Sequence, residues 1–62
     1  MKLIDIKILS EELHVKPKTI YDWVHKKQIP YIKLGRRLVR FDRNEIEKWV
    51  HKRQKKSEYL NL

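Results

Sequence analysis

The spacing of apolar residues near the N-terminus predicts a short helix over residues 5–13. Four residues recur three or four positions apart and share one face of such a helix: Ile6, Leu9, Ser10 and Leu13. Asp5 is a suitable N-cap, because its carboxylate can accept a hydrogen bond from the first turn. Ser10 is small and lets a second helix approach closely, whereas Glu11 and Glu12 fall on the outer side.

A second helix is predicted after a short turn formed by residues 14–16. Pro17 marks its start, since proline is best tolerated in the first turn, where its missing N–H is not needed. Its apolar face is formed by Ile20, Trp23 and Val24. We expect residues 28–30 to end it, because the residue before Pro30 is disfavoured in the helical conformation. Two helices joined by a three-residue turn form a helix-turn-helix arrangement.

The remaining pattern predicts a β-hairpin and a third helix. Residues 31–41 are rich in β-branched and aromatic residues around Gly35, which is expected to allow a tight turn of two or three residues. The inward and outward faces of these strands stay open. Asp42 is a good N-cap for a helix to about residue 55, with Glu45 at the third position as in a capping box. Its inner stripe is Ile46, Trp49, Val50 and Arg53.

This order of elements defines an expected fold class. We predict an α+β fold, mostly α, with the order helix, helix, β-hairpin, helix, which is that of a small winged helix-turn-helix. The domain is expected to span residues 1–56, because the apolar pattern is lost beyond them. Residues 57–62 are expected to form a flexible C-terminal tail.

Composition narrows the possible chemistry. The chain has 62 residues and no cysteine, which excludes disulfides, thiolate zinc sites and cysteine nucleophiles. Its three histidines have no carboxylate cluster nearby, and Glu45 and Glu47 point in different directions on a helix. We therefore expect no metal, no cofactor and no enzymatic activity. No apolar run approaches the roughly 18 residues of a membrane span, so a cytoplasmic protein without a membrane partner is expected.

The net charge of +8 is concentrated in the middle of the chain. Residues 1–15 have two basic residues against three acids, and residues 41–62 have six against four. Residues 16–40 reach +7, with Asp22 as the only acid against eight basic residues: Lys16, Lys18, Lys26, Lys27, Lys33, Arg36, Arg37 and Arg40. Such a concentration predicts a surface that binds a polyanion. The alternative is a solvated basic face without a partner.

An ordered set of short motifs extends this interpretation. The motifs are Val15-x-Pro17-x-Thr19 at a helix start, Ile29-Pro30 at its stop, Lys33-x-Gly35-Arg36-Arg37 at the hairpin tip and Ile46-x-x-Trp49 in the last helix. Together they resemble the excisionase-type winged helix-turn-helix proteins, which are relatives of the DNA-binding domain of MerR regulators. The resemblance covers residues 3–53. The sequence departs from the family pattern at His14, where glycine is usual, and at Lys16, where serine is usual.

The resemblance implies how the protein would bind double-stranded DNA. The second helix would lie in the major groove, and the hairpin wing would touch the neighbouring backbone or minor groove. The candidate DNA-binding residues are Lys16, Lys18, Thr19, Tyr21, Asp22, His25, Lys26, Lys33, Arg36, Arg37 and Arg40. Asp22 could accept a hydrogen bond from a cytosine amino group, but we favour its pairing with Lys18 or Lys26. Arg36 and Arg37 suit a narrow minor groove, and a charged edge that blocks sheet aggregation is the alternative.

The resemblance also implies a biological role. An accessory factor for site-specific DNA recombination in a phage or mobile element would bind as side-by-side copies along nucleoid DNA, with an integrase or recombinase as partner. A small MerR-like transcriptional regulator and the DNA-binding domain of a larger recombinase are alternatives. A protein-interaction module would not need a charge of +7 in 25 residues, and RNA binding more often uses exposed aromatic residues.

Overall fold

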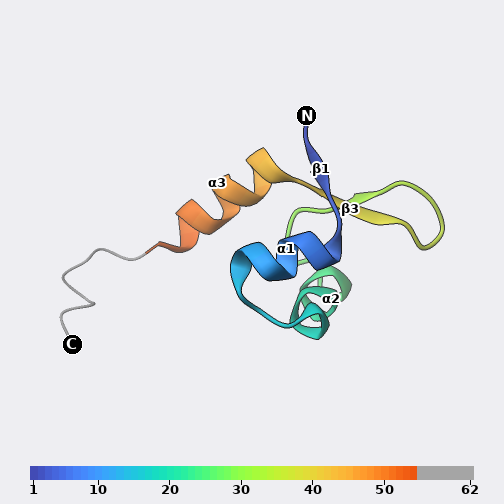
Figure 1. The fold of residues 1–62 in the computed structure, drawn as a ribbon, viewed down its shortest axis with the longest axis horizontal. Helices are drawn as coiled ribbons and strands as arrows, with labels where there is room; N and C mark the ends of the chain where they lie inside the picture. Colours follow the sequence, from blue (N-terminus) through green and yellow to red (C-terminus); the bar gives the residue numbers. More distant parts are fainter. Residues whose placement is uncertain (55–62) are drawn as a thin grey trace.

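A computed structural model describes residues 1–54 and contains three helices and a small sheet (Figure 1). In chain order the elements are β1 (Leu3–Ile4), α1 (Ile6–Leu13), α2 (Pro17–His25), β2 (Ile32–Lys33), β3 (Val39–Asp42) and α3 (Arg43–Arg53). The predicted α+β class and the helix, helix, hairpin, helix order are confirmed. The expected domain end at residue 56 and the expected tail over residues 57–62 lie outside the described residues.

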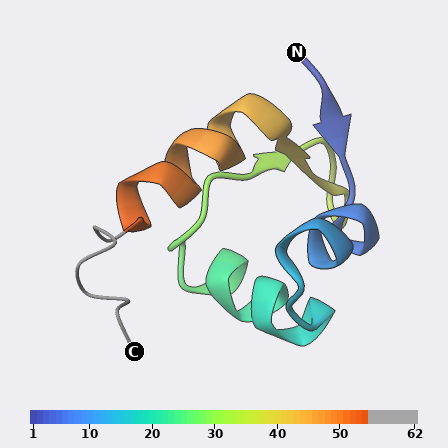
Figure 2. The same cartoon turned by 60° about the vertical axis from the view of Figure 1, so that its left-hand side comes forward.

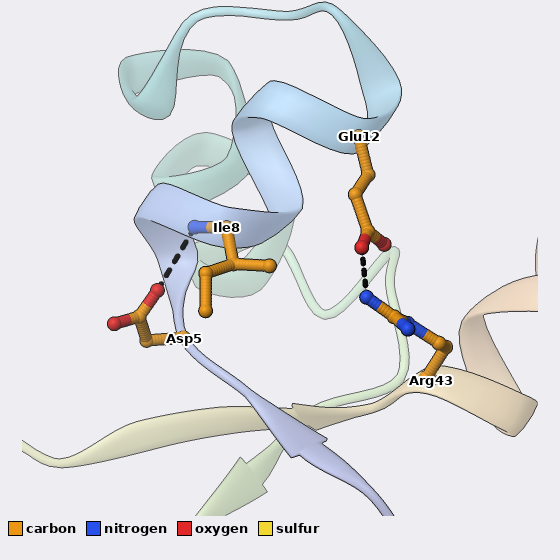
Figure 3. Close-up of polar contacts among 4 residues, drawn as sticks. All are labelled: Asp5, Ile8, Glu12 and Arg43. Carbon is orange, nitrogen blue, oxygen red and sulfur yellow. Dashed lines mark hydrogen bonds and ion pairs between the residues drawn. The ribbon is translucent and has the colours of Figure 1, made fainter.

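Helix α1 forms where the sequence predicts it, with a defined cap at each end. The Asp5 carboxylate accepts a hydrogen bond from the Ile8 N–H at 2.9 Å (Figure 3). At the other end His14 has the left-handed conformation, with φ 56° and ψ 41°. Its N–H donates to the Glu11 carbonyl and the Val15 N–H donates to the Ser10 carbonyl at 3.1 Å. These two bonds form a Schellman motif, which turns the chain sharply toward α2.

Helix α2 begins at Pro17 as predicted but ends at His25, earlier than expected. Lys27 adopts φ 57°, its N–H donates to the Val24 carbonyl at 3.0 Å, and the Gln28 N–H donates to the Trp23 carbonyl at 2.8 Å. The prediction that residues 28–30 end the helix is therefore wrong, because a second Schellman motif has already closed it.

The sheet has a strand that the sequence analysis missed. Its order is β1-β3-β2, with both neighbours antiparallel to β3. β1 is only two residues long, which is too short to show a strand periodicity. Its residues pair with the end of β3, Leu3 opposite Asp42 and Ile4 opposite Phe41. The N-terminal segment therefore extends the sheet on the side of β3 away from β2 (Figure 2).

The hairpin loop holds three residues, which settles the loop length that the sequence left open. The Leu34 N–H donates to the Leu38 carbonyl at 2.7 Å and closes a loop over residues 35–37. Gly35 does not have a positive φ. The expected tight turn is present, but it does not use the left-handed conformation that only glycine adopts readily.

Six buried apolar residues from β1, the three helices, β3 and the segment after α2 form one core. They are Ile4, Leu9, Ile20, Ile29, Phe41 and Ile46. Trp23 and Trp49 pack against this cluster but remain partly exposed. Val50, predicted to face inward, is 41% exposed. The reason is that α3 extends beyond the core after its first turns, as Figure 1 shows.

The ends of α3 also differ in detail from the prediction. The Asp42 carboxylate accepts a hydrogen bond from the Asn44 N–H at 3.1 Å, which confirms the N-cap. Glu45 does not complete a capping box, since its carboxylate bonds to the Lys48 ammonium at 3.2 Å. The helix ends at Arg53, two residues before the expected end, because Gln54 is extended with φ −70° and ψ 129°.

The left-handed conformation of His14 leads to a stability prediction. A side chain with a Cβ is unfavourable in this region, whereas glycine is not. We expect His14→Gly to raise the free energy of unfolding by about 0.5 to 1 kcal/mol. Urea unfolding followed by circular dichroism measures this change. His14→Ala, which removes the imidazole but keeps the Cβ, is the control, and an equal gain in both variants would contradict the explanation.

Candidate nucleic-acid interface

The outer face of α2 presents most of the candidate residues to solvent. Ile20 is fully buried, and Trp23 and Val24 pack against the core, so the opposite side of the helix faces outward. Six of the candidates on this segment are exposed and Thr19 is half-buried; the exposed ones are Lys16, Lys18, Tyr21, Asp22, His25 and Lys26. We call these seven residues the helix surface. Amphipathic packing is what fixes its direction.

One pair on the helix surface forms an ion pair. The Lys26 ammonium lies 3.1 Å from an Asp22 carboxylate oxygen, one helical turn away. This confirms the favoured interpretation of Asp22 as a partner of a nearby lysine. Both side chains are more than half exposed, so solvent screens the pair and its contribution to stability is small. The pair can therefore open at little cost.

The beginning of α2 differs from that of the other two helices. Asp5 and Asp42 cap α1 and α3 through their side chains, but Lys16 makes no side-chain hydrogen bond to the first turn of α2. The positive end of a helix dipole favours anions. Lys16 and Lys18 add two positive charges at the same end. The first turn of α2 is therefore electrostatically suited to a phosphate group.

The hairpin carries the second group of candidates, and its register shows how they point. Lys33 pairs with Val39, and Arg40 pairs with Ile32. Since paired residues share a face and neighbours along a strand alternate, Lys33 and Arg40 lie on opposite faces of the hairpin. Arg36 and Arg37 are exposed within the loop. The predicted cationic residues therefore surround the hairpin rather than line one side of it.

Arg40 differs from the other candidates because the structure holds its side chain in place. It is half-buried, and its guanidinium donates to the Val39 carbonyl at 2.8 Å. Lys33, Arg36 and Arg37 are exposed, and no ion pair involves them within residues 1–54. Residues 31–41 contain no acid at all. The loop therefore presents uncompensated positive charge.

Two tryptophans connect α2 to α3. The rings of Trp23 and Trp49 meet edge to face, with centroids 5.3 Å apart and planes at 61°. The Trp49 indole N–H donates to the Gln28 carbonyl at 2.8 Å, and the Arg53 guanidinium lies 4.1 Å above the Trp49 ring. Such contacts are directional, so they fix the angle of α2 as well as its distance from α3.

Arg43 and Glu12 form a contact that the sequence analysis missed. Their side chains are joined by a salt bridge between α3 and α1 (Figure 3). The Arg43 N–H also donates to the Lys2 carbonyl at 3.0 Å, while its Nε is buried without a hydrogen-bond partner in the described chain. Glu12 lies on the outer side of α1 as expected, yet its carboxylate reaches Arg43. Since the two residues are 31 positions apart, no local spacing could have indicated the pair.

A helix-turn-helix whose second helix points its charged face outward, followed by a cationic hairpin, defines a winged helix-turn-helix. In agreement with this class, a comparison with protein families matches residues 3–54 to a helix-turn-helix domain. The chain belongs to this family of excisionase-like and MerR-like DNA-binding domains. Comparisons with curated proteins and with solved structures gave no match.

Two further findings concern membranes and metals. None of the helices in residues 1–54 is long and apolar enough to cross a membrane. The same residues contain no cluster of three or more potential metal ligands.

The contacts of Trp49 lead to a prediction about the stability of the domain. Trp49→Phe keeps an aromatic ring but leaves the Gln28 carbonyl without its donor, and we expect the free energy of unfolding to fall by about 1 kcal/mol more than in a matched variant. The matched variant is Trp23→Phe, which loses the same ring volume but no indole hydrogen bond within residues 1–54. Urea unfolding compares the two, and equal losses would contradict a role for the hydrogen bond.

Proposed function

We propose that this protein binds specific sequences in double-stranded DNA as an excisionase-like accessory factor for site-specific recombination. The helix surface enters the major groove, and the wing, residues 31–41, lies on the adjacent minor groove or backbone. Lys16, Lys18, Thr19 and Tyr21 contact bases and phosphates, with Asp22, His25 and Lys26 one turn further along. Lys33, Arg36, Arg37 and Arg40 contact the DNA from the wing. The proposal assigns the protein no catalytic role and no cofactor.

The proposal rests on the position of the positive charge, which the structure gathers on α2 and the hairpin. Seven of the eight net charges come from residues 16–40. In the structure these residues form the outward face of α2 and the hairpin, while the elements that hold them carry most of the acids. A basic surface divided between a helix and a hairpin matches the major groove and its neighbouring backbone. Membership in the helix-turn-helix family supports the same partner.

The recombination role is more specific than DNA binding. It is supported by the order of the short motifs along the sequence and by membership in a family of excisionase-like domains. A single copy covers few base pairs, so tight binding needs several copies side by side on the DNA or an integrase bound next to them. Such an assembly would bend the DNA and bring recombination sites together. We place the protein in the cytoplasm, associated with the nucleoid.

The dependence of binding on salt tests the electrostatic part. If five or six phosphates are contacted, the logarithm of affinity for duplex DNA falls against the logarithm of salt concentration with a slope of about −5. Fluorescence anisotropy with a labelled duplex measures it. We expect Arg36→Ala with Arg37→Ala to reduce the slope by about 2, because two phosphate contacts are lost.

The matched control for this pair removes two charges elsewhere. Lys2 and Lys7 are exposed residues of the N-terminal segment and α1. Lys2→Ala with Lys7→Ala lowers the net charge by the same amount, and the slope should stay close to that of the natural protein. A flat salt response of the natural protein would rule out DNA as the partner, and equal effects of the two double variants would place the contacts elsewhere.

Selection of bound sequences from a random duplex pool tests specificity. We expect a preferred motif that recurs as direct repeats, because side-by-side copies have the same orientation. Lys18→Ala and Thr19→Ala should change the preferred bases, whereas the Arg36 and Arg37 variants should weaken binding to all sequences alike. An inverted repeat would favour a MerR-like regulator instead, and the absence of any enriched motif would contradict sequence-specific binding.

A further inference from the structure

Two leucines at the tip of the wing are exposed among basic residues. Leu34 is 55% exposed and Leu38 is 51% exposed, and they flank the three-residue loop. The Leu34 N–H donates to the Leu38 carbonyl at 2.7 Å, so the two side chains stand at the same level of the hairpin. Neither belongs to the hydrophobic core or packs against it. Folding of the domain therefore does not account for these two apolar side chains.

Gly35 lies in the loop next to Leu34 and has no side chain to cover the leucines. Its φ is not positive, so its conformation does not require glycine. A Cβ at this position would meet only a Leu38 methyl group at 3.9 Å, an ordinary contact. Because Gly35 has no side chain, one side of Leu38 stays uncovered and the loop backbone stays accessible. Glycine is used in this way where a backbone must approach a ligand closely.

The charges around the two leucines identify the ligand. The wing, residues 31–41, contains Lys33, Arg36, Arg37 and Arg40 and no acid, which is complementary to a polyanion. A polyanion that also offers apolar surface is duplex DNA, whose minor groove is lined by deoxyribose C–H groups and opens onto stacked bases. Apolar wedges flanked by arginines are a known means of entering that groove.

We infer that Leu34 and Leu38 form an apolar wedge that enters the minor groove and bends the DNA. Arg36 and Arg37, between the two leucines in the loop, hold the phosphates on either side of the groove. The wedge separates two base pairs at a flexible step, and burial of the two side chains offsets the cost of unstacking. The inference rests on the proposed function and adds to it the residues that cause the bend.

The test measures DNA bending and binding in the same experiment. The probe is a duplex of about 20 base pairs that carries the motif enriched in the selection, with a donor dye at one end and an acceptor dye at the other. The natural protein should bend it by about 20° or more and raise energy transfer. Leu34→Ala with Leu38→Ala should remove at least half of that rise and weaken binding by about tenfold. The slope against salt should not change, because no charge is removed.

Three further variants serve as controls for loss of apolar surface elsewhere, for loss of the wedge and for misfolding. Leu3→Ala is the matched control, since Leu3 is 40% exposed but lies on β1 at the opposite end of β3 from the loop. It should bend DNA as the natural protein does. Leu34→Met with Leu38→Met keeps a wedge and should retain the bend. Gly35→Ala should reduce the bend without loss of stability, which provides a test even if the double alanine variant does not fold.

The possible results separate the inference from the proposed function. Binding without bending by the natural protein, or normal bending by the folded double alanine variant, overturns the wedge but leaves DNA binding intact. Self-association that depends on the two leucines, with bending unaffected, also overturns it and makes them a contact between copies. Absence of any salt-dependent binding by the natural protein contradicts the proposed function itself.

Discussion

The packing of Phe41, Leu9 and Ile20 into one cluster is the interaction on which the rest of the structure depends. These are the three largest fully buried side chains, and each comes from a different element. Ile20 belongs to α2, Phe41 to β3 at the end of the wing, and Leu9 to α1. Because so small a domain can bury little surface, this cluster determines how the outward face of α2 and the wing are placed relative to each other.

Directional contacts at the edge of the core fix the orientation of the helices, which apolar packing alone does not determine. The left-handed Lys27 ends α2 early and sends the chain toward α3, where the Gln28 carbonyl accepts the Trp49 indole hydrogen bond. The salt bridge from Arg43 to Glu12 joins α3 to α1 in the same way. Apolar burial alone is insensitive to rotation, whereas hydrogen bonds and ring contacts prefer particular angles. Such contacts are important for a domain that must match the spacing of DNA grooves.

The sequence predicted those features that depend on local spacing. Neighbours within one or two helical turns are enough to predict three features: the N-caps Asp5 and Asp42, Pro17 at a helix start, and the outward direction of the helix surface. The missed features depend on residues distant in sequence: β1 pairs with β3, where Leu3 lies opposite Asp42, and Glu12 contacts Arg43. The end of α2 was misplaced because a lysine adopted a conformation that glycine normally supplies. The candidate DNA contacts themselves remain predictions.

The core and the proposed DNA-binding surfaces use different residues, and this separation has an energetic consequence. The hairpin loop and the outward face of α2 contribute no fully buried side chain. Their positive charges therefore add nothing to the packing of the core. Like charges gathered on one surface repel each other and oppose the folded state. A bound polyanion removes that repulsion and stabilises the fold by mass action. The positive charge that favours DNA binding therefore weakens the free protein, and the small core must supply enough stability to tolerate it.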